Sequence, residues 1–488
     1  MAQKTESILD HYPDYEVTIG IEVHVQLTTK TKIFCSCANT VSKKPNSDIC
    51  SICAGHPGVL PVLNKKVVNY AILAGLATDC KIANISEFAR KHYFYPDLPK
   101  GYQITQNELP ICSEGHVPIR LEDGSTKNIR LIRIHIEEDA GKNIHASTGD
   151  ISLVDLNRAG TPLLEIVSYP DIASTYEAKE YLKSLRSIVQ YLNICSGNME
   201  EGAFRADTNI SVKKKADKEL GTRCELKNIN SFKFIGDAIE YEIQRQIELV
   251  ENGQKVKQQT RLWDSKAKKT APMRSKEEAA DYRYFHDPDL PLIEVNEEWI
   301  SRIEKMLPEL PHQKLDRFVK EKDLSAYEAE ILVNDLELAD YFEKAYSLRP
   351  SKQIVNWILR DLLGYLKEQK ITLIECKVIP EHLARIVELV EASKINNNAA
   401  KEVFEIVAQT GQEPEEVVKE KGLEQIGSIK QLEAIVKEIV EANPENVEKY
   451  RSGKDRLFGF FVGQAMKQTK GKGDPKIIQE LLKKHLKG

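Results

Sequence analysis

The sequence predicts an α+β protein: a mostly antiparallel-sheet cradle domain, followed by a helical domain and a helical tail domain. Residues 16–27 alternate strictly between apolar and polar side chains, as a strand with one buried face does. Further alternating segments follow up to residue 227. From about residue 312 onward, apolar residues recur at helical spacing almost throughout, so the fold is expected to change from sheet to helix along the chain.

Length and composition set the outer limits. A chain of 488 residues is too long for one core, and the composition shifts around Leu307-Pro308. We therefore expect a cradle domain over residues 1–305, a helical domain over 306–409 and a basic tail domain over 410–488. Hydrophobic residues make up 41% and charged residues 29%, which is typical of a water-soluble globular protein. No apolar run reaches about 18 residues, which argues against a membrane-spanning helix.

The cysteines predict a metal site. The first 16 residues contain no apolar signal-peptide core, so we expect a cytoplasmic protein whose thiols stay reduced. Four of the nine cysteines form a C-x-C pair and, twelve residues later, a C-x-x-C pair: Cys35, Cys37, Cys50 and Cys53. Two such pairs suit tetrahedral zinc, and four thiolates close its coordination shell, so the zinc would be structural. The alternative is four reduced thiols in a loop.

The strand predicted over residues 16–27 carries two candidate functional residues. Glu22 and His24 share its polar face, roughly 7 Å apart by strand geometry. An amphipathic strand with a solvated face would explain the same pattern. Matching polar faces on other strands favour a functional role, because together they would form a cradle for a charged substrate with a metal ion.

Acidic residues on two further strands strengthen this interpretation. A hairpin is predicted over residues 117–136, and its return strand ends in three consecutive acids, Glu137, Glu138 and Asp139. Adjacent carboxylates repel one another, and either a metal ion or exposure to solvent would relieve the repulsion. Glu165 lies inside an apolar strand, where a carboxylate is costly unless it is paired or ligates a cation.

Two later strands continue the polar face. Over residues 204–212, apolar side chains alternate with Arg205, Asp207 and Asn209, and a further polar row follows over 223–227. Asn, His and paired Asp and Arg are unusual for a sheet face that is only solvated. These strands therefore favour a binding site on the open side of the sheet.

The remaining elements are predicted from apolar spacing. The expected helices cover residues 65–90, 172–193, 232–251, 324–347, 351–369, 380–393 and 398–409. Two segments rich in proline and aromatic residues, 91–106 and 274–291, fit neither period. We predict them as loops that either pack on their own rings or line a ligand cleft.

Charge is unevenly distributed near the C-terminus. Residues 449–488 contain 11 Lys and Arg against 3 Asp and Glu, a net charge of +8, whereas residues 401–448 contain 5 Lys against 12 Glu, a net charge of −7. The basic part includes phenylalanines and a glycine-rich run with Lys467, Lys470 and Lys472. Such a segment suits a nucleic-acid backbone, and a solvated helix face is the simpler alternative.

Several nucleotide and hydrolase motifs are missing. The sequence contains no G-x-x-x-x-G-K-[ST], no G-x-G-x-x-G and no G-x-S-x-G. A bound nucleotide is therefore expected on the sheet cradle, with a metal ion bridging its phosphates.

Nine motifs occur in the order in which they occur in a known family. They are IGIEVHVQL (19–27), GHPGVLPVLN (55–64) after the four cysteines, YFYPDLPKGYQITQ (93–106), HIEEDAGK (135–142), DLNRAGTPLLEIVS (155–168), MEEGAFRADTNIS (199–211), ELKNINSF (225–232), DYRYFHDPDLP (281–291) and GFFVGQAMKQTKGKGDPK (459–476). On these segments the chain resembles the GatB family, the B subunits of the tRNA-dependent amidotransferases, over essentially its full length.

The resemblance implies ATP-dependent amidation of mischarged Glu-tRNA(Gln), Asp-tRNA(Asn) or both. The B subunit would bind the 3′ end of the tRNA and phosphorylate the side-chain carboxylate. Ammonia released from glutamine by an amidase, the A subunit, would then displace the phosphate, and a small C subunit would complete a heterotrimer. Phosphoryl transfer depends mainly on positioning and charge neutralisation, which Mg²⁺ and oxygen ligands supply.

The resemblance also implies roles for particular residues. The implied catalytic and magnesium site consists of Glu22, His24, Glu138 and Glu165. Strand alternation instead places Glu137 beside His135, so Glu137 and Glu138 both stay candidates. The candidates for the ATP or acyl-phosphate pocket are Arg205, Asp207 and Asn209. The implied cofactors are ATP and Mg²⁺, besides the structural Zn²⁺ at the cysteines.

Two other functions compete with this one. The first is a non-catalytic, zinc-stapled scaffold that only binds tRNA. The acidic residues argue against it, because a protein that binds polyanionic RNA has no reason to concentrate carboxylates near its ligand without a metal. A zinc hydrolase is disfavoured, because four cysteines leave the zinc no open position.

Overall fold

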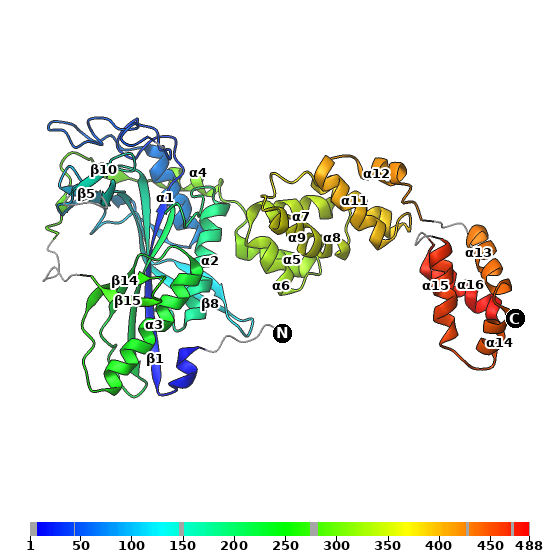
Figure 1. The fold of residues 1–488 in the computed structure, drawn as a ribbon. Helices are drawn as coiled ribbons and strands as arrows, with labels where there is room; N and C mark the ends of the chain where they lie inside the picture. The colour runs from blue at the N-terminus through cyan, green and yellow to red at the C-terminus, as the bar shows by residue number, and fades with distance from the viewer. Residues whose placement is uncertain are drawn as a thin grey trace. The chain divides into compact units, whose positions relative to one another are not determined.

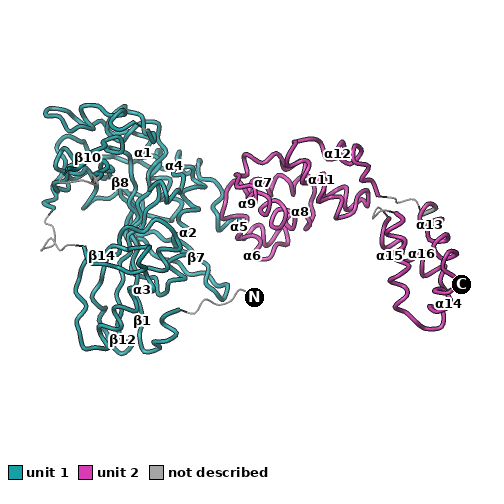
Figure 2. Tube along the Cα trace, viewed as in Figure 1, with its two compact units in different colours: residues 1–314 teal, residues 315–488 magenta. Residues whose placement is uncertain are grey.

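The computed structural model describes residues 7–42, 44–145, 151–273, 282–425, 429–469 and 473–487. Its architecture is α+β, as predicted, and all the described strands precede residue 295 (Figure 1). The chain divides into two compact units, residues 1–314 and residues 315–488 (Figure 2). Within the described residues, no helix is long and apolar enough to cross a membrane.

A ten-stranded sheet forms the frame of the first unit. Its order is β15-β14-β13-β12-β1-β11-β8-β6-β2, and β7 also pairs with β8. Neighbouring strands are antiparallel except for β13 and β14, which are parallel. The bounds are β1 Tyr15–Gln26, β2 Lys81–Ile82, β6 Cys112–Ser113, β7 His116–Arg120, β8 Thr126–Glu138, β11 Pro162–Ser168, β12 Phe204–Lys214, β13 Cys224–Lys227, β14 Gln259–Asp264 and β15 Lys269–Pro272.

Strand β1 is the predicted amphipathic strand, and it lies in the middle of the sheet. Ile19, Ile21 and Val23 on its apolar face are fully buried, whereas the polar residues between them keep some exposure. Pairing with β11 and β12 places His24 opposite both Glu165 and Arg205. The register of the sheet therefore decides which polar side chains meet.

Three helices pack on the apolar side of the sheet. Helices α2 and α3 lie side by side along it (Figure 1), and their buried residues share one core with the apolar residues of β1. Helix α1 contributes to the same core. The polar side chains of β1 consequently point to the opposite side. The bounds are a 3-10 helix η1 Ile8–His11, α1 Lys65–Ala77, α2 Thr175–Tyr191, α3 Phe232–Glu251 and α4 Glu297–Glu304.

The sequence predicts α1, α2 and α3; the helix predicted over residues 172–193 is shorter in the structure, Thr175–Tyr191, and α1 differs most from its predicted length. Helix α3 has the predicted bounds, and α2 begins after Ser174, whose hydroxyl accepts the Glu177 amide. Helix α1 ends at Ala77 instead of near residue 90. The Thr78 hydroxyl bonds back to a carbonyl of the last turn, and Asp79 adopts the left-handed conformation with φ +52°. The residues beyond it form short strands instead.

The first unit also contains three small sheets, β16-β4-β5, β10-β9 and β17-β3. The first of these joins the two aromatic segments, 91–106 and 274–291. The prediction of loops was wrong where these strands form: β4 overlaps the start of the first segment, β5 lies inside it, and β16 lies in the second. The two segments therefore lie against each other. The bounds are β3 Ile85–Ser86, β4 Ala89–His92, β5 Tyr102–Thr105, β9 Lys142–His145, β10 Ser152–Asp155, β16 Phe285–His286 and β17 Ile293–Glu294.

The second unit is helical, as predicted. The predicted helix 324–347 is divided in two, because the Asp335 side chain accepts the Leu338 amide and caps a new helix. A π-helical segment, Ile358–Leu362, connects α8 and α9. The bounds are α5 Pro311–Glu321, α6 Ala326–Val333, α7 Leu336–Leu348, α8 Lys352–Trp357, α9 Leu363–Gln369, α10 Pro380–Glu391, α11 Asn397–Thr410, α12 Pro414–Lys421, α13 Ile429–Glu441, α14 Pro444–Arg451, α15 Leu457–Gln468 and α16 Pro475–Lys487.

The boundary between the compact units falls inside α5, close to the composition shift in the sequence. Helices α13 to α16 share a hydrophobic core that includes Leu432, Phe461 and Leu482. The further division of the second unit after residue 409 stays a prediction.

Candidate functional site

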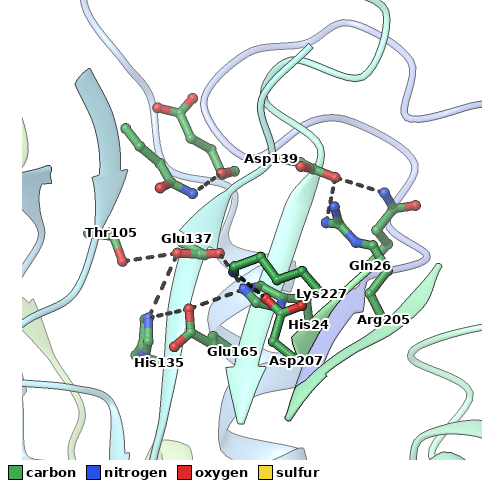
Figure 3. A network of polar contacts seen from close by, with 12 residues as sticks. His24, Gln26, Thr105, His135, Glu137, Asp139, Glu165, Arg205, Asp207 and Lys227 are labelled. Atoms are coloured by element: carbon green, nitrogen blue, oxygen red, sulfur yellow. Dashed lines mark hydrogen bonds and ion pairs between the residues drawn. The ribbon is translucent and has the colours of Figure 1, made fainter. Parts of the chain in front are cut away.

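A cluster of two imidazoles and two carboxylates lies on the polar side of the sheet, on the adjacent strands β1, β11 and β8. His24 Nε2 lies 3.2 Å from Glu165 Oε2 and 3.7 Å from Glu137 Oε1. His135 Nε2 lies 3.6 Å from the same Glu165 oxygen and 3.8 Å from Glu137 Oε2. Figure 3 shows the four side chains pointing toward one another. Glu165, the carboxylate inside the apolar strand β11, is thus paired with His24 and His135, which offsets the cost of burying its charge.

Protonation in this cluster follows from burial and charge. Burial opposes the charging of His24, but the hydrogen bond and the negative charge of Glu165 raise the pKa of His24 to about 9. Burial alone would raise the pKa of Glu165, but His135 and His24 hold it well below its usual range. The side chains of His24 and Glu165 therefore form an ion pair at neutral pH.

The same residues could hold a metal ion. Ligand atoms of His24, Glu137 and Glu165 all lie within 4.8 Å of one another. Two carboxylates and one imidazole form a donor set suited to a divalent cation, and oxygen ligands favour Mg²⁺. A bound cation would take the place of the His24 proton, because only a neutral imidazole ligates a metal.

The three consecutive acids at the end of β8 have different partners. Glu137 accepts a hydrogen bond from the Thr105 hydroxyl at 3.3 Å, besides its contacts with the imidazoles. Glu138 forms an ion pair with Lys100 and accepts the Ile104 amide at 2.9 Å. All three carboxylates are buried from solvent, so their repulsion is relieved by separate hydrogen-bond and ion-pair partners instead of by water.

The structure therefore separates the two rival acids. Glu137 lies in the cluster with His24 and Glu165, whereas Glu138 lies with Lys100. Strand alternation explains this, because His135 and Glu137 are two residues apart and share a face of β8. Asp139, which follows the strand, accepts hydrogen bonds from Gln26 at 2.8 Å and from Arg205 at 2.9 Å.

Glu22 shares the polar face of β1 but lies outside the tight cluster. Burial, followed by the charges of Glu165, Glu225 and Asp207, raises the pKa of Glu22. Its carboxylate accepts a hydrogen bond from Asn209 at 3.2 Å. Glu22 is therefore a carboxylate among other carboxylates, which is the electrostatic environment that a cation would stabilise.

Strand β12 carries the three residues predicted for the nucleotide pocket, and each contacts a neighbour on the polar face. Arg205 donates to Asp139, Asn209 donates to Glu22, and Asp207 accepts from Lys227 at 2.7 Å. These residues border the acidic cluster on the side of β12, as Figure 3 shows for Arg205 and Asp207. The structure thus brings together the polar rows that the sequence predicts on separate strands.

Three site residues were not singled out from the sequence. Lys227 lies between Asp207 and Glu225, at 2.7 and 3.0 Å, and their charges raise its pKa against the effect of burial. Lys91 lies over the Tyr282 ring at 4.8 Å, and the charge of Glu137 raises its pKa against burial. His135 is the third. Lys227 and His135 lie on the polar faces of predicted strands, so the alternation of polar and apolar residues could have identified them. Lys91 lies in a segment that follows neither the strand nor the helix period, so it could not be identified in this way.

The four clustered cysteines also meet as predicted. Ligand atoms of Cys35, Cys37, Cys50 and Cys53 lie within 4.8 Å of one another, with Cys53 Sγ at 3.6 Å from Cys35 Sγ and 3.9 Å from Cys50 Sγ. Thiolates around zinc lie about 3.8 Å apart when each Zn–S bond is about 2.3 Å. The four sulfur atoms therefore lie close enough together to ligate one metal ion.

One of the tail lysines can be placed. Lys467 lies on α15 and is exposed. Lys470 and Lys472 lie outside the described residues. The tail contacts therefore stay a prediction.

Two family models match the chain. The model described as the GatB/GatE catalytic domain matches residues 17–301, which include the acidic cluster and the cysteine cluster. The model described as the GatB domain matches residues 340–486.

Relatives match over almost the whole chain, and each of those named here is the B subunit of an aspartyl/glutamyl-tRNA(Asn/Gln) amidotransferase. The protein from Thermodesulfovibrio yellowstonii is 52% identical over 475 residues, which cover 97% of this chain and 99% of that protein. The protein from Syntrophotalea carbinolica is 52% identical over 475 residues, with the same coverage. The protein from Persephonella marina is 50% identical over 477 residues, covering 97% of this chain and all of that protein.

Proposed function

Because this chain belongs to the GatB family, the B subunits of tRNA-dependent amidotransferases, we propose that it amidates mischarged Glu-tRNA(Gln), Asp-tRNA(Asn) or both with ATP. One observation supports this function above the others: the open side of the sheet gathers His24, Glu137 and Glu165 within 4.8 Å of one another. A cation-binding set of acids on a face bordered by Arg205 and Lys227 suits a substrate that carries phosphate.

The proposed reaction has two steps. An oxygen of the substrate carboxylate attacks the γ-phosphorus of ATP, the bond to the bridging oxygen breaks, and ADP leaves. Ammonia then attacks the acyl carbon of the acyl phosphate and loses a proton, and inorganic phosphate leaves with the bonding electrons. A carboxylate is a poor acyl electrophile, so the first step supplies the leaving group for the second.

The residues of the cluster divide these tasks. His24, Glu137 and Glu165, with Glu22 beside them, would hold Mg²⁺, which when bound neutralises phosphate charge. Glu138 is the weaker candidate ligand, because its carboxylate is engaged by Lys100.

The residues of β12 and β13 would orient the reacting groups. Arg205 and Lys227 present cationic donors toward the same face, and we assign them to the phosphate oxygens of ATP or the acyl phosphate. Asp207 keeps Lys227 in position, and the Asn209 amide can donate to Glu22 or to a substrate oxygen.

We propose partners and further ligands on the same basis. An amidase, the A subunit, would release ammonia from glutamine, and a small C subunit would complete the heterotrimer. A structural zinc ion would bind at the four cysteines. Lys467, Lys470 and Lys472 would contact the tRNA backbone away from its 3′ end.

The Glu165→Gln variant tests the function. The full chain, assembled with its A and C partners, is supplied with mischarged tRNA and ATP, and phosphate release and amidated tRNA are followed. We expect both rates to fall by about 100-fold or more with tRNA binding unchanged, because a group worth several kcal/mol to the transition state is lost. The exposed Glu122→Gln variant is the matched control and should react like the wild type.

Two results would contradict the proposal. Unchanged turnover by the Glu165→Gln variant would remove the acidic cluster from the reaction. A wild-type protein that binds tRNA but releases no phosphate with either mischarged tRNA would support the non-catalytic scaffold instead.

A further inference from the structure

Lys32 is a buried lysine beside the cysteine cluster. Its side chain has no exposed surface, although lysine is rarely buried without a partner. Its Nζ lies 3.5 Å from Cys53 Sγ and 3.4 Å from the Leu156 carbonyl oxygen. The cation therefore reaches both the candidate metal site and the chain segment that leads into β11.

The positive charge of Lys32 can compensate the negative charge of a metal-bound cysteine cluster. Four thiolates around a divalent cation carry a net charge of about −2, and net charge away from water is costly unless it is compensated. An ammonium group that donates to a metal-bound thiolate lowers this cost, as polar groups around metal ligands generally do. Cys53, which Lys32 contacts, is the one buried sulfur of the four.

The same region is connected to the acidic end of β8. The Ile33 amide donates to the Gly160 carbonyl at 2.9 Å, and the Gly160 amide donates to the Asp139 carbonyl at 3.0 Å. The Asp139 amide in turn donates to the Thr161 carbonyl at 2.8 Å. Backbone hydrogen bonds therefore lead from the residue next to Lys32 to the last of the three acids.

A small cavity lies between the two sites. Its volume is about 20 Å³, room for one water molecule, and its lining includes Cys35, Cys53, Lys100, Glu138 and Gly160. The cysteine cluster and the acidic strand end thus line the same cavity.

We propose that Lys32 is a positioning residue that donates to the metal-bound thiolate of Cys53 and to the Leu156 carbonyl, and so ties the cysteine metal site to the segment that supports the acidic strand end. The proposal rests on zinc binding at the four cysteines, which is part of the proposed function. It assigns to the zinc site a second role, which is to hold Glu138 and Asp139, at the acidic end of β8, in place beside the proposed amidation site.

The test compares three variants of the full chain. Lys32→Met removes the ammonium group and keeps the length of the side chain. Lys30→Met, at an exposed position two residues away, is the matched control. Lys32→Gln keeps an N–H donor without the charge, and it replaces Lys32→Met if that variant does not fold.

Zinc release to the chelator 4-(2-pyridylazo)resorcinol is the first measurement. We expect release from Lys32→Met to be about 10- to 100-fold faster than from the wild type, which is the usual effect of losing a group that supports a metal ligand. Release from Lys30→Met should match the wild type. A wild-type rate in the Lys32 variant would overturn the proposal.

Two measurements distinguish loss of the specific Lys32 contacts from a general loss of protein stability. In the cobalt-substituted protein, loss of the N–H···S contact raises the energy of the sulfur lone pair, so the sulfur-to-cobalt absorption band should move to longer wavelength in Lys32→Met. Amide hydrogen exchange in residues 156–161 should become faster while zinc is still bound. An unshifted band, or unchanged exchange in that segment, would contradict the proposed link.

Different results would overturn the proposal for Lys32 and the proposal that the chain amidates tRNA. Absence of stoichiometric zinc from the purified wild type would overturn this inference. It would leave the amidation proposal intact, because the Glu165→Gln variant tests that proposal without reference to zinc.

Discussion

At the scale of single residues, the charge on His24 has the most direct chemical consequence. Its imidazole pKa of about 9 leaves it protonated at pH 7 to 8 and paired with Glu165. A cation that binds through the neutral imidazole must displace this proton. The proton and the metal ion therefore compete for one position.

We predict that Mg²⁺ binds more tightly as the pH rises. Below about pH 9 the affinity should increase up to about tenfold per pH unit, since one proton leaves for each ion bound, and it should level off above. Calorimetric titration of Mg²⁺ at pH 7, 8 and 9, in two buffers of different ionisation enthalpy, measures both the affinity and the released proton. Equal affinity at pH 7 and pH 9 would show that His24 is not a ligand.

We predict that the stability of the metal-free fold changes with pH in the opposite direction. The folded-state pKa of His24, about 9, lies above the ordinary value of 6.5, so protonation favours the folded state. This contribution is fully present below about pH 6.5 and is lost as the pH rises through 9. Mg²⁺ would restore the stability that the proton no longer supplies.

Single-residue inferences from the sequence depended on strand alternation. Alternation placed Glu22 and His24 on one face and favoured Glu137 over Glu138 as the neighbour of His135, and the cost of a charge in an apolar strand identified Glu165. Lys32, Lys91 and Lys100 were not identified from the sequence, because they lie outside the alternating segments. Lys32 contacts Cys53 and Lys100 contacts Glu138 only in the folded chain, and there the charge of Glu137 acts on Lys91.

At the scale of elements, a buried ion network joins α3 to the sheet. The Glu242 carboxylate accepts from Arg245 at 2.6 Å and from Gln246 at 2.9 Å, and it lies 3.3 Å from Arg261 on β14. Gln246 also donates to the Ile210 carbonyl on β12. The helix is therefore fastened to the strand that carries Arg205.

We predict that Glu242→Ala destabilises the fold by about 3–5 kcal/mol, because two arginines lose the buried carboxylate between them. Urea unfolding of the full chain measures the loss, and the exposed Glu248→Ala variant on the same helix is the control. A loss no larger than that of the control would mean that solvent reaches the arginines and replaces the carboxylate.

Element boundaries were the least predictable part of the fold. Helix α3 was predicted residue for residue, because its apolar spacing stops where the helix stops. Helix α1 was predicted too long, because the residues after Asp79 remain apolar while the backbone turns there. The parallel pair β13 and β14 had no signal in the sequence, since periodicity shows which face of a strand is buried and not which strand lies beside it.

At the scale of the whole molecule, the two proposed functions fall in different compact units. The acidic cluster belongs to the first compact unit, whereas the basic residues 449–488 belong to the second. The proposed tRNA contacts and the proposed chemistry therefore lie in separate units and can be altered independently.

We predict that replacing Lys467, Lys470 and Lys472 together with Ala weakens tRNA binding and lowers its salt dependence. If all three contact phosphates, the slope of log affinity against log salt should fall by about 2 to 3. Filter binding of tRNA to the assembled complex across salt concentrations measures this. Replacing the exposed Lys401, Lys419 and Lys421 is the matched control, and an equal effect of both triples would remove the tail from the interface.

The central place of β1 has a consequence for synthesis on the ribosome. This strand is made first, yet its partner β12 ends about 190 residues later. At about 5–20 residues per second, the nascent strand waits roughly 10 to 40 s for β12, so the edge that pairs with β12 stays unpaired for that time. An unpaired strand edge can pair with other chains, so we expect the growing polypeptide to be most prone to aggregation before β12 is made.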